Sequence, residues 1–187
     1  MHIRSFIAVA ISEQVRRAAE KLLKELKPAG GHGVRWVDPA AMHITLSFLG
    51  NIGENDIVPL MDLIRQATRD TAAFALDFRG LDAFPSLGRI RTIIVPVLDE
   101  TGALSKIQRN LHVLLAEKGY RVENRKFVPH LTLGRVKGNV RGTRLREALE
   151  ERAAVDLGSC WVREVFLMRS DLTPRGARYT PMGHVSL

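Results

Sequence analysis

Residues 43–48 read His-Ile-Thr-Leu-Ser-Phe, and residues 130–135 read His-Leu-Thr-Leu-Gly-Arg. Both stretches carry the aliphatic and β-branched residues that favour strands. Because successive side chains of a strand point to opposite faces, the first stretch predicts that His43 and Thr45 share one face. The residues predicted for the opposite, buried face are Ile44, Leu46 and Phe48.

The second stretch repeats this division between a polar face and a buried face. His130 and Thr132 fall on one side of the predicted strand, and Leu131 and Leu133 fall on the other. Strict alternation also places Arg135 on the buried side, where a charged group is costly. A bulge, the end of the strand or a long side chain that curls around the edge would resolve this conflict.

The two stretches together predict one site for phosphorus chemistry. In-line displacement at phosphorus needs a proton-transfer group on each of two opposite sides, and histidine, with a free pKa of about 6.5, serves as acid or base near neutral pH. Hydroxyls such as those of Thr45 and Thr132 can donate hydrogen bonds to the non-bridging oxygens. Either motif alone is typical of an ordinary strand. Their combination favours His43 and His130 facing each other across a cleft.

The rest of the chain alternates between strand-like and helix-like periodicity. Apolar runs predict strands at residues 3–11, 43–49, 74–84, 92–98, 128–136, 162–168 and 179–187. Amphipathic spacing predicts helices that run from an N-cap at Ser12 to a stop at Pro28 and Gly30–Gly31, over 54–67, from 104 to near Gly119, and over 144–152. The order of these elements predicts an α+β fold with two similar halves.

The size and composition of the chain predict a single globular domain over residues 1–187, built as two intimately packed lobes. Hydrophobic residues make up 45% and charged residues 26%, which excludes extensive disorder. No stretch approaches the roughly 20 apolar residues of a membrane span, and the N-terminus lacks the features of a secretory signal. We therefore expect no membrane association and a cytoplasmic location.

The single cysteine, Cys160, lies in an apolar run that predicts a buried packing role.

The chain is basic, with 28 Lys and Arg against 20 Asp and Glu and a formal net charge of +8. Such a surface attracts polyanions, although many soluble proteins are basic without binding nucleic acid. The distribution is more informative than the total, because basic residues crowd around the second motif. They are Arg121, Arg125, Lys126, Arg135, Lys137, Arg141, Arg144 and Arg146.

The order of several segments resembles the 2H phosphoesterases, and within them the RNA 2′,3′-cyclic phosphodiesterases, also called LigT-like or ThpR-like 2′-5′ RNA ligases. The segments that carry this resemblance are residues 6–8 (Phe-Ile-Ala), 34–37 (Val-Arg-Trp-Val), 42–50 (around the first motif), 80–85 (Gly-Leu-Asp-Ala-Phe-Pro), 127–135 (around the second motif) and 170–179. They extend over nearly the whole chain, which makes the resemblance far more specific than either four-residue motif.

This resemblance implies a bilobal fold with antiparallel sheets, outer helices and a central cleft. It implies hydrolysis of a terminal RNA 2′,3′-cyclic phosphate to a 2′-phosphate, with reverse 2′-5′ RNA ligation, and it requires no metal and no cofactor. The implied proton donor is His43 and the implied proton acceptor is His130. Substrate contacts are assigned to Thr45, Thr132 and Arg135. Phe6 is a further candidate, because aromatic rings stack on the bases of single-stranded nucleic acid, although an aromatic in an apolar strand belongs to the core by default. The implied partner is RNA with a cyclic phosphate end, tRNA fragments included, and two fused half-sites predict a monomer.

Three other interpretations of the sequence stay open beside this one. A zinc enzyme fits poorly, because the chain has no His-Glu-x-x-His motif and no cysteine pair. A non-catalytic RNA-binding module of the same fold would explain the charge but not the presence of both histidines and both threonines. A cyclic phosphodiesterase that acts on a small nucleotide would use the same machinery on a different substrate.

Overall fold

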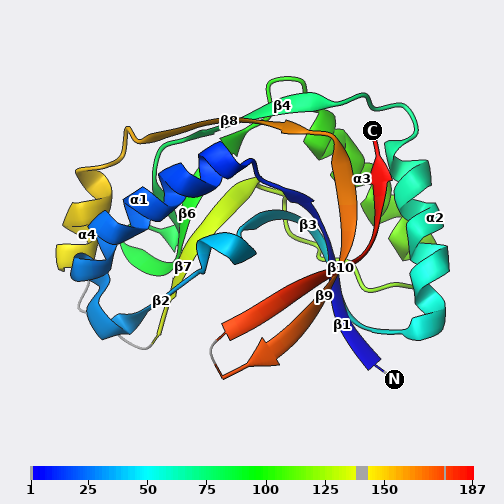
Figure 1. Ribbon diagram of the computed structural model, residues 1–187, viewed down its shortest axis with the longest axis horizontal. Helices are drawn as coiled ribbons and strands as arrows, with labels where there is room; N and C mark the ends of the chain where they lie inside the picture. The colour runs from blue at the N-terminus through cyan, green and yellow to red at the C-terminus, as the bar shows by residue number, and fades with distance from the viewer. Residues whose placement is uncertain (1, 138–142, 175) are drawn as a thin grey trace.

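The structure, a computed structural model, describes residues 2–137, 143–174 and 176–187 (Figure 1). Its strands are β1 (His2–Ala10), β2 (Val34–Trp36), β3 (His43–Gly53), β4 (Phe74–Arg79), β5 (Asp82–Ser86), β6 (Arg89–Leu98), β7 (His130–Val136), β8 (Asp156–Val162), β9 (Glu164–Thr173) and β10 (Gly176–Ser186). Its helices are α1 (Glu13–Gly30), α2 (Ile57–Thr68), α3 (Ala103–Glu117) and α4 (Thr143–Glu150), with 3-10 turns η1 (Gly31–Gly33), η2 (Pro39–Ala41) and η3 (Glu54–Asp56). The predicted α+β architecture is confirmed.

The strands form two antiparallel sheets that each combine strands from both halves of the chain. One sheet has the order β10-β9-β1-β3, and the other has the order β2-β7-β6-β4-β8, with β5 paired to β6. The sheets approach each other where β3 contacts β7. The two strands that begin with a His-x-Thr motif therefore lie at the junction of the two sheets.

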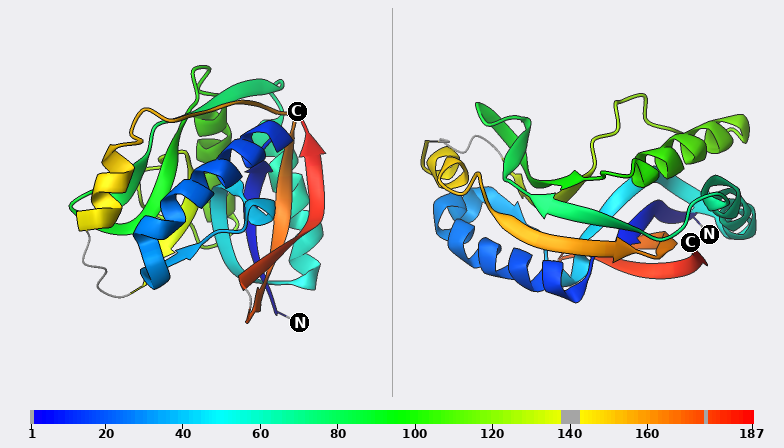
Figure 2. Two further views of the ribbon diagram at one scale, coloured as in Figure 1. Left: turned by 60° about the vertical axis from the view of Figure 1, so that its left-hand side comes forward. Right: turned by 90° about the horizontal axis from the view of Figure 1, so that it is seen from above.

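The helices cover the two sheets in pairs. Helix α1 packs against β8 and α4, whereas α2 packs against α3 and β10, and α3 also contacts β3. Figures 1 and 2 show α1 with α4 at one end of the molecule and α2 with α3 at the other. The Ser12 hydroxyl accepts a hydrogen bond from Val15 N at 3.3 Å, so the predicted N-cap of α1 is confirmed. A single continuous core of buried apolar side chains joins the elements of both sheets.

The predicted stop of α1 at Gly30–Gly31 is confirmed: the helix ends at Gly30, and its C-cap Gly31 has a φ of 49°. Pro28 does not stop the helix, because a proline in the last turn removes only one bond near the helix end. Two predicted strand boundaries are wrong. The strand predicted at 74–84 is divided into β4 and β5 at Gly80, where φ is 86°. The strand predicted at 162–168 is the end of β8 and the first half of the longer β9, which are separated at Arg163.

Both motif strands contain a bulge at the same position. The pairing register skips Leu46 between β1 and β3, and it skips Leu133 between β6 and β7. A bulge shifts every later side chain to the other face of the strand. Phe48 is consequently 43% exposed, so the prediction that it shares the buried face of Ile44 and Leu46 is wrong. Arg135, at the equivalent position of the second motif, is exposed for the same reason.

The short strand β2 depends on a glycine in β7. A Cβ on Gly134 would lie 2.9 Å from both Trp36 Cε3 and Val34 Cγ1, too close for a rigid ring and a β-branched side chain to accommodate. We expect Gly134→Ala to lower the free energy of unfolding by about 1–3 kcal/mol, because β2 must move away from β7. Urea unfolding measures this loss. Gly88→Ala is the matched control, since its nearest side-chain atom is 3.7 Å away, and equal stability of the two variants would contradict the prediction.

Candidate active site

The His43 ring is fixed at the start of β3 by two hydrogen bonds. Its Nδ1 lies 2.9 Å from the Ala41 carbonyl oxygen, and its Nε2 lies 3.0 Å from Thr45 Oγ1. Because a carbonyl oxygen only accepts, Nδ1 carries a proton and donates it. In the neutral ring, Nε2 is therefore the basic nitrogen, and the Thr45 hydroxyl donates to it. Both residues are half-buried, so Nε2 is the atom of this ring that can exchange a proton with a ligand.

His130 is held in the same way at the start of β7. Its Nδ1 donates to the Val128 carbonyl oxygen at 2.7 Å, which again makes Nε2 the basic nitrogen. In both motifs the accepting carbonyl belongs to the residue two positions before the histidine. The two halves of the chain thus present two imidazoles in one tautomer, each oriented by the backbone just before its strand.

Burial and neighbouring positive charges lower the pKa of both histidines. Burial lowers the pKa of His43 below 6.5, the hydrogen bond to Ala41 opposes this, and the charges of Arg135 and His130 lower it further. Burial likewise lowers the pKa of His130. The hydrogen bond to Val128 opposes this effect, and the charge of Arg135 lowers the pKa further. A charge on His130 therefore reaches His43, and Arg135 acts on both rings. Both histidines are mainly neutral at pH 7 without a ligand.

Thr132 and Arg135 lie on the same face of the sheet. Along β6, Ile94 is the Cα partner of Thr132 and Thr92 is the partner of Arg135. Thr92 and Ile94 are two residues apart in β6 and point the same way. Their partners Arg135 and Thr132 therefore project from one face of the sheet. The bulge at Leu133 resolves the conflict between alternation and the implied phosphate contact of Arg135. We refer to the surface formed by His43 and Thr45 of one sheet and by His130, Thr132 and Arg135 of the other as the histidine face, because the charges of His130 and Arg135 act on His43.

Aromatic rings pack directly against both imidazoles. Phe6 stacks on His43 with ring centroids 4.7 Å apart, and Tyr179 meets His43 edge-on at 5.0 Å. Phe84 meets His130 edge-on at 4.9 Å. Phe6 is only 3% exposed, which favours the default core interpretation over stacking of this ring on a base. These rings desolvate the imidazoles, which is the first cause of their lowered pKa.

Sequence reasoning assigned no role to Tyr179 or Phe84. Both belong to segments that resemble the family, but an apolar or aromatic residue in a strand has a core role by default. Only the fold shows that each ring touches an imidazole. Of the basic residues near the second motif, Arg125 lowers the pKa of His130 and Arg146 pairs with Glu150. Arg141 lies outside the described residues.

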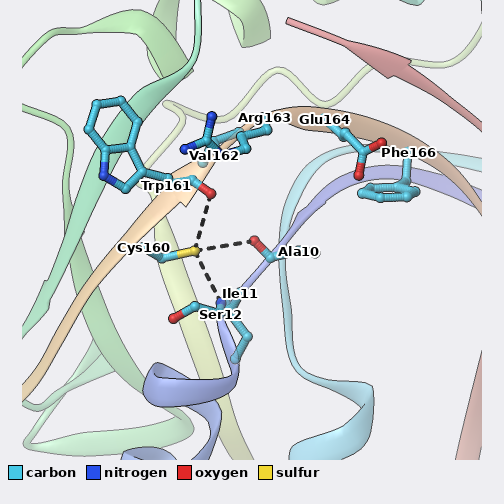
Figure 3. Close-up of a pocket in the computed structure, with 9 residues that line it drawn as sticks. All are labelled: Ala10, Ile11, Ser12, Cys160, Trp161, Val162, Arg163, Glu164 and Phe166. Atoms are coloured by element: carbon cyan, nitrogen blue, oxygen red, sulfur yellow. Dashed lines mark hydrogen bonds between the residues drawn. The ribbon is translucent and has the colours of Figure 1, made fainter.

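Cys160 is a packing residue, as predicted. It is 4% exposed, and burial raises the pKa of its thiol. Its sulfur accepts a hydrogen bond from Ser12 N at 3.1 Å at the edge of a cavity of about 190 Å³ (Figure 3). Neither motif histidine nor either motif threonine lines this cavity. A buried thiol with a raised pKa is a poor nucleophile.

The described residues contain neither a clustered metal-binding group nor a membrane-spanning helix. Within residues 2–137, 143–174 and 176–187, no three His, Cys, Asp or Glu side chains gather in an arrangement suited to a metal ion. Among the helices of these same ranges, none is both long and apolar enough to cross a bilayer.

Comparison with known proteins identifies the family. The model of the LigT-like phosphoesterases matches residues 9–94 and again residues 95–179, and each match contains one His-x-Thr motif. The RNA 2′,3′-cyclic phosphodiesterase of Methanothermobacter thermautotrophicus is 37% identical over 97% of both chains. That of Aquifex aeolicus is 32% identical and covers 95% of this chain and 94% of its own.

Solved structures agree with this match. TT0787 of Thermus thermophilus has a TM-score of 0.81 and 28% identity, and the alignment covers 98% of this chain and 97% of that one. E. coli LigT complexed with 3′-AMP has a TM-score of 0.79 over 100% of this chain and 99% of that one, and its 23% identity supports the fold alone. Because the family model matches both halves of the chain and the relatives quoted above are 32–37% identical over nearly its whole length, the chain belongs to the LigT-like phosphoesterase family.

Proposed function

We propose that this protein hydrolyses RNA 2′,3′-cyclic phosphate ends to 2′-phosphates through acid/base catalysis by His43 and His130. The observation that carries the proposal is the matched state of the two imidazoles, which are both held as Nδ1–H tautomers with a basic Nε2. Thr45 lies 3.0 Å from Nε2 of His43. The names of the relatives support the substrate, since the two quoted above are RNA 2′,3′-cyclic phosphodiesterases.

In the proposed reaction the oxygen of a water molecule attacks phosphorus while the bond from phosphorus to O3′ breaks. Nε2 of His130 takes a proton from the water, and Nε2 of His43 gives a proton to the departing O3′. The phosphorus stays bonded to O2′, which leaves a 2′-phosphate. The hydroxyls of Thr45 and Thr132 donate to the non-bridging oxygens, and Arg135 supplies positive charge there.

The lowered pKa of His43 is compatible with its proposed role as the acid. In the free protein, burial and positive neighbours disfavour the imidazolium form. A bound phosphate anion adds an opposite charge next to the ring, which favours that form and raises its pKa. Substrate binding would therefore charge His43 at the moment when a proton donor is needed.

The same two groups would run the reverse reaction. If an RNA 5′-hydroxyl replaces water as the nucleophile, the product is a 2′-5′ linkage. We propose RNA ends, tRNA fragments included, as the substrate class, with the protein acting as a monomer. A non-catalytic RNA-binding role is the alternative that the first experiment must exclude.

Product analysis tests the proposal. Dialysed, chelator-treated protein is given a short RNA that ends in a 2′,3′-cyclic phosphate, and the product phosphate is located by NMR or by enzymatic digestion. We expect turnover without added metal and a product that is only the 2′-phosphate. A 3′-phosphate product, loss of activity with the chelator, or binding without turnover would contradict the proposal.

The pH dependence of kcat/KM should report both histidines in the free protein. The rate falls at low pH when His130 becomes protonated, and it falls at high pH when His43 loses its proton. Because burial lowers both pKa values, we expect a bell-shaped profile with its maximum below pH 6.5.

Arg135→Gln provides the control for this profile. The charge of Arg135 lowers the pKa of both rings. Its removal should therefore raise both pKa values and move both limbs of the profile to higher pH. Limbs that stay in place in Arg135→Gln, or a maximum well above pH 7 in the unmodified protein, would show that other groups control the rate.

A further inference from the structure

Two arginines lie side by side at the edge of the histidine face. Arg35 in β2 and Arg135 in β7 are direct Cα partners in an antiparallel pair, and both side chains are exposed. Directly opposed side chains project to the same face with Cβ atoms about 4.5–5.5 Å apart. Arg35 therefore extends the histidine face by one strand beyond Arg135.

Within the part of the chain that the structure describes, neither arginine of this pair has an ion-pair partner, since none of the ion pairs there includes Arg35 or Arg135. The residues outside that part contain no Asp or Glu. Like charges directly opposite each other destabilise a sheet. An anion bound between the two guanidinium groups would remove this repulsion.

The two guanidinium groups have different surroundings. The charge of Arg135 lowers the pKa of both histidines, whereas Arg35 is not among the charges that act on either ring. Arg35 Nη2 instead lies 3.6 Å from the position that a Cβ would occupy on Gly176, at the start of β10 in the other sheet. Arg35 thus reaches from β2 in one sheet to the start of β10 in the other.

We propose that Arg35, together with Arg135, binds a second phosphate, namely the phosphodiester next to the cyclic end of an RNA strand. A guanidinium binds phosphate through paired, charge-assisted hydrogen bonds, and Arg is better suited to this than Lys. The site would make the protein select oligonucleotide ends over mononucleoside cyclic phosphates. This inference rests on the proposed function and adds a determinant of specificity to it.

The test compares three substrates that share one terminal nucleotide. They are a mononucleoside 2′,3′-cyclic phosphate, a dinucleotide with the same cyclic end, and that dinucleotide with an uncharged methylphosphonate linkage. With the unmodified protein, we expect kcat/KM to be roughly 10- to 100-fold higher for the charged dinucleotide than for the methylphosphonate, the size of one charge-assisted contact. In Arg35→Gln this ratio should fall close to one.

Arg109→Gln in α3 is the matched control, because it removes the same charge from an exposed position on a helix outside the histidine face. It should keep the full ratio. The slope of log kcat/KM against log salt concentration for the dinucleotide should become shallower by about 0.7 in Arg35→Gln only.

The outcomes separate this inference from the proposed function. If Arg35→Gln lowers kcat/KM equally for all three substrates, Arg35 supports the fold or the reacting phosphate, and the inference is wrong. An unchanged ratio in Arg35→Gln also overturns it. If the unmodified protein turns over none of the substrates, the proposed function fails. Equilibrium binding of the 2′-phosphate dinucleotide, compared with its methylphosphonate form, then tests the second phosphate site without turnover.

Discussion

Replacing His43 or His130 by alanine should lower kcat on a cyclic-phosphate-ended dinucleotide by about 10²- to 10⁴-fold. Each ring supplies one of the two proton transfers of the proposed reaction, and its Nε2 is the nitrogen left available by the backbone bond to Nδ1. The double variant should be little slower than the worse single variant, because the two groups act as a unit. Single-turnover kinetics with saturating protein measures the chemical step directly.

His112→Ala is the control for these variants, since this histidine lies on α3 and, within the described residues, has no aromatic contact with either motif histidine. It should keep the full rate. Circular dichroism and urea unfolding check that His43→Ala remains folded, because its ring packs between Phe6 and Tyr179. A folded double variant that retains the rate of the unmodified protein would exclude the two imidazoles from the chemistry.

Replacing Thr45 or Thr132 by valine should reduce kcat by about 10²- to 10³-fold, the usual effect of removing one donor to a developing negative charge. Valine has nearly the shape of threonine and favours strands equally, so the change removes a hydroxyl and little else. Thr45→Val also removes the 3.0 Å contact to His43 Nε2. We therefore expect the larger loss at this position.

Thr180→Val, at an exposed position of β10, is the matched control for the threonine variants. It should leave kcat unchanged. If Thr45→Val and Thr132→Val change KM alone, the hydroxyls bind the ground state and the transition state equally and do not stabilise the developing charge.

Alternation predicted the motif strands correctly as far as Leu46 and Leu133 and failed beyond them in both. Leu46 and Leu133 are buried as predicted, but each is skipped by the pairing register. A leucine in a bulge has the same composition and apolarity as a leucine in a regular strand. Nothing in the local sequence therefore placed the bulge or indicated that Phe48 would be exposed. Only the charge of Arg135 on a predicted buried face indicated that alternation is interrupted before it.

The second class of features that the sequence could not predict depends on pairing between distant segments. β2 has only three residues, too few for periodicity to detect, and its register opposite β7 decides that Arg35 faces Arg135. The contacts of Phe84 and Tyr179 with the imidazoles also join segments far apart in the chain. In contrast, the α1 N-cap at Ser12 and the buried role of Cys160 depend on local pattern, and both predictions are confirmed.

The opposed roles of the two imidazoles can be tested most directly with a cyclic substrate in which sulfur replaces O3′. A thiolate leaves without help from an acid, since thiols ionise near pH 8.5, so this substrate needs a base but little protonation of the leaving atom. We predict that His43→Ala recovers roughly 10²-fold or more of its lost rate on this substrate, whereas His130→Ala stays as slow as before. Equal recovery of both variants, or recovery of neither, would contradict an acid and a base acting on opposite sides of one phosphorus.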